Sequence, residues 1–417
     1  MTAIGDRLVL EVGDVAHGGH CVARDKDQVV FVRHALPGEQ VEVVVTSKGP
    51  KGRYLFADVH KVLTASPDRR EAPCAHAGVC GGCDWQHVEL AAQRELKARV
   101  LREQLHRLGG LTEVGGAPLE ESVQVAAVAG DHEGLGWRTR VRYAVDNNGR
   151  AGFRRHGSHL VEPVESCPLV SQGVDSAEVT RRTWLGVDDI TVVASSTGEV
   201  AVLPSPMVRT LPSLPSSVTV PGLRGRKWVR ESAGGRDWRV GVEGFWQVHP
   251  GAADALIDAV RAVLAPQPGE HLLDLYCGVG LFAGSLAADV GDTGRIDAVE
   301  TSVQACGDAR RNMHDLPHVH IHEASVDLWL TEHIVTGADL VVLDPPRSGA
   351  GRKVMESLLD MAPRVIAYVS CDPASLGRDI GYAREAGWTV ASVRGFDLFP
   401  MTHHLEAVAA LVPPARG

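Results

Sequence analysis

The sequence predicts an α/β protein in which a doubly wound parallel sheet follows two β-rich parts. Short β-rich runs divided by turn residues fill residues 1–65, and a second β-rich region spans about 122–245. Over the last ~170 residues, apolar strand-like runs alternate with helical stretches, which is typical of a doubly wound sheet. We therefore expect three domains, at residues 1–65, 66–240 and 241–417.

The composition limits the class of protein. The chain has 417 residues, 44% of them hydrophobic, which is enough for a large core. It contains no run of about 18 apolar residues and no basic segment followed by an apolar one at its start, so we expect a cytoplasmic protein without a membrane span. The formal net charge of -10 argues against indiscriminate nucleic-acid binding and leaves room only for a local basic face.

Residues 1–65 read as a small β-barrel. Five runs fit short strands: LVLEVGDV, HCVARD, QVVFVRH, QVEVVVTSK and YLFADVHKVL. Lys48, Lys51 and Arg53 surround the SKGPKGR turn and could give the barrel an oligonucleotide-binding face. The alternative is a structural barrel with solvated basic residues.

Four of the eight cysteines form a pattern that suggests a metal centre. Cys74, Cys80 and Cys83 have the spacing C-x5-C-x2-C, and Cys167 follows much later in a Ser-Cys-Pro sequence. Disulfides are a poor explanation in a reducing compartment. Four thiolates could hold an iron-sulfur cluster or zinc, and the spacing alone leaves both open, with unligated thiols as the alternative.

Between the cysteines a helix and a basic hairpin are predicted. Apolar residues recur at helical spacing from Val88 to Leu108, and Gly109 and Gly110 follow. Further along, an Asn-Gly turn joins two alternating runs, as in a β-hairpin. Arg138, Arg140 and Arg142 should share one strand face, where they could bind phosphate or simply be solvated. The Pro-, Ser- and Gly-rich residues 203–226 read as a connecting loop.

The first strand of the C-terminal region leads into a glycine-rich turn, DLYCGVGLFAG. Gly278, Gly280 and Ala283 satisfy the Rossmann-like pattern G-x-G-x-x-A, and the next strand ends in Glu300. Such a turn lets the backbone approach a ligand closely, and an acidic residue can bind ribose hydroxyls. The motif therefore suggests an adenosine-containing cofactor, either NAD or S-adenosylmethionine.

Three later motifs lie at expected strand ends. DPPRSG, which starts at Asp344, and YVSCDP, which contains Cys371, each follow an apolar run, and the closing segment DLFPMTHHLEAVAALV brings Glu406 to the same edge. Amino-group methyltransferases have an aromatic residue after a similar D/N-P-P, where this chain has Arg347, so exocyclic amine methylation is not expected. Taken alone, Cys371 could be a core thiol and Glu406 a surface carboxylate.

Taken together, these motifs resemble the S-adenosylmethionine-dependent RNA uracil-C5 methyltransferases of bacterial tRNA and 23S ribosomal RNA. The resemblance covers nearly the whole chain, including FWQVHP, DLYCGVG, DPPRSG, YVSCDP and FPMTHHLE. It implies a TRAM-like RNA-binding barrel at residues 1–65 and a [4Fe-4S] cluster on Cys74, Cys80, Cys83 and Cys167. It also implies that the residues contacting S-adenosylmethionine are Gln247, Tyr276, Gly278, Gly280, Glu300, Asp327 and Asp344.

The resemblance assigns roles to two further residues. Cys371 would add to C6 of a uridine as nucleophile, and Glu406 would remove the C5 proton as general base. Asp344 could hold the cofactor or polarise the uracil. His249 and Asp372 stand where the family often has Asn, and Phe245, Trp246 and Phe399 could stack on a flipped base or belong to the core.

Three rival interpretations remain: a DNA cytosine-C5 methyltransferase, a nicotinamide oxidoreductase with an iron-sulfur centre, and a non-catalytic iron-sulfur RNA-binding protein. The first lacks its usual Pro-Cys pair, and the second leaves Cys371 and Glu406 without a task. The third would be expected to lack one of those two residues. We expect an RNA partner, no obligate protein partner and a monomer.

Overall fold

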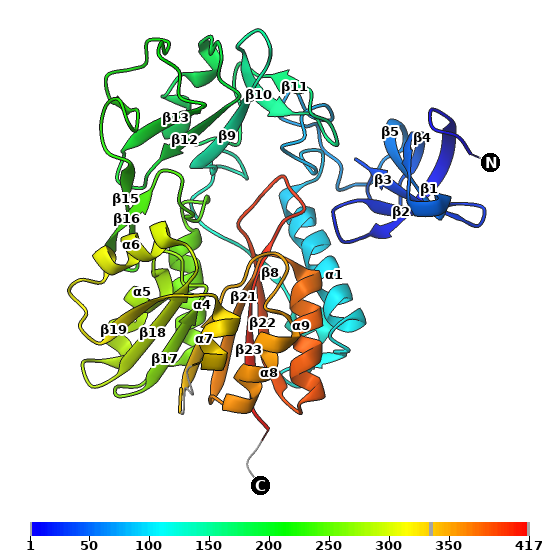
Figure 1. The fold of residues 1–417 in the computed structure, drawn as a ribbon. Coiled ribbons are helices and arrows are strands. Elements are labelled where there is room, and N and C mark those ends of the chain that lie inside the picture. Colours follow the sequence, from blue (N-terminus) through cyan, green and yellow to red (C-terminus); the bar gives the residue numbers. More distant parts are fainter. Residues whose placement is uncertain (1, 333–336, 415–417) are drawn as a thin grey trace.

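The computed structural model describes residues 2–332 and 337–414, which form a barrel, a central sheet and a large α/β sheet (Figure 1). In the view of Figure 1 the barrel stands to the right, the central sheet at the top and the α/β sheet below. The predicted fold class is confirmed.

The five strands of the N-terminal barrel lie in the order β1-β2-β3-β5-β4, and β4 pairs with β1 to close it. The pairing of β3 with β5 is parallel and the others are antiparallel. Alternate valines on β4, among them Val41, Val43 and Val45, point into the barrel and are buried. Each of the five predicted runs forms a strand. They are β1 (Arg7–Val15), β2 (Cys21–Asp25), β3 (Gln28–Arg33), β4 (Gln40–Lys48) and β5 (Tyr54–Thr64), with the 3-10 turn η1 (Pro50–Gly52) between the last two.

The predicted helix is α1 (Leu90–Arg107), and it ends just before Gly109 and Gly110. Its buried face carries a charged residue, Lys97, whose Nζ lies 2.5 Å from Asp397 Oδ1 and donates a hydrogen bond of 3.0 Å to the carbonyl oxygen of Phe399. The side chains of Lys97 and Asp397 are 0% and 2% exposed, so this ion pair joins α1 to the C-terminal part of the chain inside the core.

The central sheet has six strands in the order β11-β10-β9-β12-β13-β14. β9 and β10 form the predicted hairpin, with Gly149 of the Asn-Gly turn at φ +76°. The elements of this part are β9 (Arg140–Val145), β10 (Ala151–Arg154), β11 (Val161–Pro163), α3 (Gln172–Asp175), η2 (Val179–Arg181), β12 (Asp189–Ala194), β13 (Val200–Ser205) and β14 (Val218–Thr219).

The predicted basic face of β9 is only partly available. Arg140 is buried, lies 3.3 Å from Glu231 and donates to the carbonyl oxygen of Gly244, so it supports the loop before the large sheet and cannot reach a phosphate. Arg142 stays exposed, but it forms an ion pair of 2.9 Å with Asp189. The alternating pattern correctly placed Arg140 and Arg142 on one face of the strand. Only Arg142 faces solvent, because other parts of the fold cover Arg140.

The large sheet has eight strands in the order β19-β18-β17-β20-β21-β23-β22-β8. Its strands are β8 (Val125–Ala127), β17 (His271–Leu275), β18 (Arg295–Glu300), β19 (Val319–Glu323), β20 (Leu340–Leu343), β21 (Val365–Ser370), β22 (Thr389–Asp397) and β23 (Glu406–Val412). The helices beside it are α4 (Ala252–Leu264), α5 (Leu281–Val290), α6 (Val303–Asn312), α7 (Val326–Glu332), α8 (Gly351–Met361) and α9 (Pro373–Glu385).

Successive residues of each central strand pack against opposite helical layers. On β21, Val365, Ala367 and Val369 share a core with α4 and α5, whereas Ile366 and Tyr368 share one with α1, α8 and α9. Both faces of the strand are therefore buried, which explains why the sequence reads as a continuous apolar run.

The middle of the chain contributes to two parts of the fold. The segment with α1, β6 (Glu113–Val114), β7 (Ala117–Pro118), α2 (Leu119–Ser122) and β8 packs on the large sheet, and β8 pairs in parallel with β22. The hairpin of β15 (Trp228–Ala233) and β16 (Arg236–Gly241) contacts α6. The domain boundaries at 65 and 240 stay a prediction, and this packing argues against a single unit at residues 66–240.

No helix within residues 2–332 and 337–414 is both long and apolar enough to cross a membrane.

Lys97→Ala should lower the free energy of unfolding by about 3–5 kcal/mol, because it leaves the Asp397 carboxylate buried without its cation. Urea denaturation followed by circular dichroism measures this change. Arg107→Ala is the matched control on the same helix, since it breaks an exposed pair with Glu103 and should cost less than about 1 kcal/mol. An equally small loss for Lys97→Ala would contradict the stabilising role of the buried pair.

Candidate active site

Three of the predicted site residues meet at the carboxyl edge of the large sheet. Asp344 follows β20, Cys371 follows β21 and Glu406 opens β23. Since β21 and β23 are antiparallel and Ser370 lies opposite Ala407, the ladder places Cys371 and Glu406 next to each other at its end. The sequence separates these two residues widely, and strand register brings them together.

The buried position of these groups disfavours their ionised forms. Burial, with the nearby Glu406 and Asp344 carboxyls, raises the pKa of the Cys371 thiol to about 11. Burial and the Asp344 charge raise the pKa of Glu406 well above its usual range, and burial raises that of Asp344 to about 7. The Arg347 guanidinium acts in the opposite direction on both Cys371 and Glu406. The DPPR arginine therefore favours the ionised forms of the thiol and the carboxyl.

Cys371 borders a cavity of about 160 Å³ that the N-terminal barrel helps to close. His17 of the loop between β1 and β2 lies 3.0 Å from the Asp372 carboxylate, and the Asp372 side chain also caps α9 by accepting a hydrogen bond from Ser375 N. The cavity is lined by His17, Gly18, Gly19, Val100, Arg347, Cys371, Asp372, Pro373, His403, His404 and Leu405. The barrel is thus part of the wall beside the cysteine.

The loop between β22 and β23 is held by elements from earlier in the chain. Lys97 donates to the carbonyl oxygen of Phe399, and the backbone N–H of Asp84 donates to that of Met401. The Asp84 carboxylate also lies 2.7 Å from His403 Nδ1. Because Asp84 directly follows Cys83, the cysteine loop is tied to the segment that leads into Glu406.

The turn DPPRSG is held at its end by two buried residues, Tyr368 and Asp379. Asp379 Oδ2 accepts hydrogen bonds from the backbone N–H groups of Ala350 and Gly351, at 2.8 and 3.2 Å, and from the Tyr368 hydroxyl at 2.7 Å. These bonds leave little freedom to the turn that carries Asp344 and Arg347.

The glycine-rich turn has the shape that a cofactor loop needs. Gly278 has φ +57° and donates a 3.0 Å hydrogen bond to Glu300, and Gly280 has φ +89°, where a Cβ would overlap the Met313 side chain. Asp274, fully buried on β17, accepts a hydrogen bond from Ala283 N and so caps α5, while its second oxygen has no protein partner. A buried polar atom without a partner is uncommon in folded proteins, so this oxygen is a candidate contact for a bound ligand.

The remaining predicted cofactor residues differ in how far they are buried. Tyr276 ends the strand with φ +65°, and burial, together with the charge of Asp327, raises its pKa to about 12. Asp327 itself is on the exposed first turn of α7 and lies 3.4 Å from Lys353. Gln247 is buried in the loop between β16 and α4.

Three of the predicted ligand cysteines, Cys74, Cys80 and Cys83, lie in one glycine-rich loop, and Cys167 approaches them from the segment after β11. Burial raises the pKa of Cys80, Cys83 and Cys167, and each also feels the charge of another cysteine of the set. A Cβ on Gly82 would stand 3.4 Å from the Cys80 sulfur. Among the described residues, no three His, Cys, Asp or Glu side chains are grouped tightly enough to hold a single metal ion.

The three aromatic residues considered for base stacking have different surroundings. Phe245 is 71% exposed, whereas Trp246 is buried against Trp238, with ring centroids 6.1 Å apart. Phe399 meets Trp137 edge to face at 6.0 Å, beside the buried His249. Trp246 is therefore a core residue, and of the three, Phe245 is the one open to solvent.

Sequence reasoning missed several supporting residues. Asp274 was signalled by a carboxylate within an otherwise apolar strand, but Asp379 and Lys97 have no local signal, since their partners are distant in sequence. His17 could not have been found from a motif either, because its partner Asp372 lies in another part of the fold.

Comparisons with known proteins agree with this architecture. The family model of the TRAM domain matches residues 2–60, and that of tRNA (Uracil-5-)-methyltransferase matches residues 327–412. An uncharacterized RNA methyltransferase of Streptomyces avermitilis is 48% identical, covering 99% of this chain and 100% of its own. The 23S rRNA (uracil(1939)-C(5))-methyltransferase RlmD of Halomonas elongata is 33% identical, covering 98% and 90% of the two chains.

A solved structure has the same fold. The tRNA (uracil-54, C5)-methyltransferase of Pyrococcus abyssi in complex with S-adenosyl-L-homocysteine superposes with a TM-score of 0.71 at 23% identity, covering 97% of this chain and 99% of the other.

The fold and the site define a methyltransferase joined to a TRAM barrel. The chain belongs to the S-adenosylmethionine-dependent RNA uracil-C5 methyltransferase family, as its motifs predicted. This membership confirms the enzyme class and leaves the DNA methyltransferase and oxidoreductase interpretations without support.

Asp372→Asn should lower the pKa of His17, because the hydrogen bond and charge of Asp372 raise that pKa above 6.5. The ion pair is present while His17 is protonated and is lost as the pH rises through the raised pKa. At the acid end it persists until about pH 2, since burial of Asp372 is outweighed by its bonds to His17 and Ser375, which lower its pKa to about 2.

Nuclear magnetic resonance titration of the His17 ring protons measures this shift. Asp292→Asn, at an exposed turn of the large sheet, is the control and should leave the His17 titration unchanged. If His17 titrates identically in wild type and Asp372→Asn, the contact between barrel and active site does not persist in solution.

Proposed function

We propose that the protein methylates C5 of a uridine in RNA through a covalent adduct between Cys371 and C6 of the base. The observation that carries this proposal is the placement of Cys371 beside Glu406 by the β21–β23 register, with Asp344 and Arg347 at the same edge. The nucleophile and the cation line one small cavity, and the Glu406 carboxyl lies beside the nucleophile in the sheet.

The need for a nucleophile follows from the chemistry of uracil, whose C5 is a weak nucleophile. When the Cys371 thiolate adds to C6, the C5–C6 electron pair moves toward the C4 carbonyl oxygen, and the enolate makes C5 reactive. C5 can then take the methyl group and carries both it and the original hydrogen. Arg347 favours the thiolate that this first step requires.

The last step needs a base, and we assign this role to Glu406 because it lies beside Cys371 in the sheet. Removal of the C5 proton restores the C5–C6 double bond and expels the Cys371 sulfur as thiolate. Burial favours the protonated form of Glu406 in the free protein, so Glu406 must pass its proton to solvent before it can take the C5 proton. Arg347 and the positive sulfonium of the cofactor both favour that loss.

S-adenosylmethionine would supply the electrophilic methyl group. The positive-φ glycine turn and the unpaired buried oxygen of Asp274 fit a ligand at this edge. The residues proposed to hold it are Gln247, Tyr276, Gly278, Gly280, Glu300, Asp327 and Asp344.

Ribosomal RNA is the first candidate substrate, and tRNA is the second. The relative from Halomonas elongata, whose name specifies 23S rRNA, is 33% identical over nearly the whole chain, whereas the tRNA enzyme from Pyrococcus abyssi shares the fold at 23% identity. A cytoplasmic monomer without an obligate protein partner is part of the same proposal.

Cys74, Cys80, Cys83 and Cys167 would together hold a [4Fe-4S] cluster. What supports this proposal is the proximity of the thiols, since Cys80, Cys83 and Cys167 each lie close enough to another cysteine of the set to sense its charge. The cluster would then stabilise the loop from which Asp84 reaches His403.

Incubation with labelled S-adenosylmethionine and unmodified rRNA or tRNA transcripts should place the label on C5 of a uridine. Cys371→Ala should lower transfer by at least about 1000-fold, because no adduct can form. Glu406→Gln should accumulate a protein–RNA adduct that resists denaturation, since the proton cannot be removed. Normal turnover of Glu406→Gln would exclude Glu406 as the base, and no transfer to either RNA would favour a non-catalytic RNA-binding protein.

Protein purified without oxygen should be brown and contain about four iron atoms per chain. Cys80→Ser should lower the iron content, whereas Cys306→Ser should not, because Cys306 is a buried cysteine on α6 outside the set of four. A colourless protein that contains zinc would contradict the cluster.

A further inference from the structure

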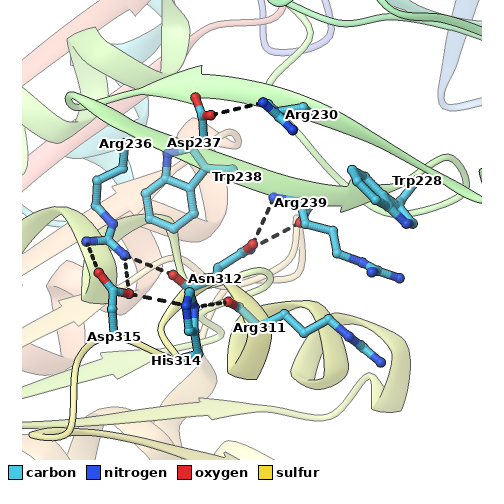
Figure 2. A pocket seen from close by; sticks show the side chains of 10 residues that line it. All are labelled: Trp228, Arg230, Arg236, Asp237, Trp238, Arg239, Arg311, Asn312, His314 and Asp315. Atoms are coloured by element: carbon cyan, nitrogen blue, oxygen red, sulfur yellow. Dashed lines mark hydrogen bonds and ion pairs between the residues drawn. The ribbon is translucent and has the colours of Figure 1, made fainter.

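A second hollow lies between the β15–β16 hairpin and α6, and none of its lining residues borders the Cys371 cavity. It has a volume of about 780 Å³ (Figure 2) and is lined by Trp228, Arg230, Arg236, Asp237, Trp238, Arg239, Arg311, Asn312, His314 and Asp315. An adjoining hollow of about 640 Å³ shares Trp228, Arg239 and Arg311 and extends to Val303, at the start of α6. We call the two together the hairpin groove.

The hairpin groove carries more positive than negative charge. Three of its arginines have carboxylate partners, in the pairs Arg230–Asp237 at 3.5 Å, Arg236–Asp315 at 2.8 Å and Arg239–Asp308 at 2.9 Å. Arg226 and Lys227 have no carboxylate within 4.0 Å among the described residues, and Arg311 is 4.0 Å from Asp308, which Arg239 already occupies. The lining also contains the Glu243 carboxylate, so the cations available to a ligand are Lys227 and Arg311 in the lining and Arg226 beside it, on Trp228. They lie together in a protein whose net charge is -10.

Aromatic stacking fixes two of the guanidinium groups. The Arg226 and Arg239 guanidinium carbons lie 4.6 and 4.7 Å from the centre of the Trp228 ring. A guanidinium that stacks by its face keeps its N–H edge free for phosphate oxygens. In Figure 2 the Arg239 and Arg311 side chains extend in the same direction, away from the hairpin.

The hairpin groove also adjoins the cofactor edge. α6 begins at Val303, three residues after Glu300, and both Val303 and Gln304 line the groove. Its other wall comes from segments beside the last strand of the central sheet, with Met207 before β14 and Pro221 after it. Two adjoining hollows with separate basic residues suit a chain of phosphates better than a single anion.

We propose that the hairpin groove binds the phosphate backbone of the substrate RNA at nucleotides outside the target uridine. The proposal rests on the proposed function for the nature of the partner. It adds Arg226, Lys227 and Arg311 as residues that position the RNA without touching the reacting base.

The test compares RNA binding by wild type and a triple variant, Arg226→Glu, Lys227→Glu and Arg311→Glu, using unmodified 23S rRNA and tRNA transcripts. At about 150 mM salt the triple variant should bind the substrate RNA at least ~10-fold more weakly. The slope of log Kd against log salt concentration should fall by about 2, as expected for three lost single-strand phosphate contacts. In the methyl-transfer assay KM should rise and kcat should stay unchanged.

A matched pair of single variants separates a specific effect from a general charge effect. Arg311→Glu should weaken binding, whereas Arg352→Glu should not. Arg352 is an arginine on α8 that is about as exposed as Arg311. Its guanidinium carbon lies 4.2 Å from the centre of the Tyr382 ring. Equal losses in the two variants, or a triple variant that binds like wild type, would overturn the proposal. Circular dichroism melting verifies that each variant is folded.

Two further outcomes are decisive. Inorganic phosphate at matched ionic strength should not displace the RNA, and complete displacement by millimolar phosphate would indicate a small-anion site and overturn the proposal. If wild type binds RNA but transfers no methyl group, the proposed function fails while the binding comparison still decides the groove.

Discussion

The antiparallel pairing of β21 with β23 is the constraint on which the site depends. In a sheet of parallel strands, carboxyl ends gather at one edge, and an inserted antiparallel strand brings its amino end there instead. Glu406 can therefore open a strand at the same place where Cys371 follows one. A shift of the register by one residue would turn the Glu406 side chain to the opposite face of the sheet.

The same edge is built from parts of the chain that are far apart in sequence. The loop between β22 and β23 receives Lys97 from α1 and Asp84 from the cysteine loop, and the barrel adds His17 to the cavity wall. Burial excludes water from the reacting groups. It also raises the pKa of both the Cys371 thiol and the Glu406 carboxyl, and so disfavours the ionised forms that the reaction needs. Arg347 partly offsets that conflict.

Sequence patterns were sufficient to predict most helices and strands that position the site. They were insufficient to predict several of the contacts between these elements. The five barrel strands, α1 and the alternating strands of the large sheet follow local periodicity, and the motifs at strand ends predicted that Cys371, Asp344 and Glu406 would share an edge. β8 escaped prediction because three residues carry no periodic signal. Arg140 was read as exposed, since alternation alone cannot reveal the buried partner Glu231 on a separate hairpin.

The position of β8 in the large sheet also affects how the protein can fold during its synthesis. It pairs with β22, and α1 pairs through Lys97 with Asp397, so both await partners made about 270–300 residues later. At roughly 5–20 residues per second, a ribosome needs on the order of 15–60 s to supply them. During that interval the open edge of β8 has no native partner in the chain already made, whereas Leu96 and Val100 of α1 can already pack against the barrel core. Folding of the barrel before the chain is complete therefore covers part of the apolar surface of α1 while β8 is still unpaired.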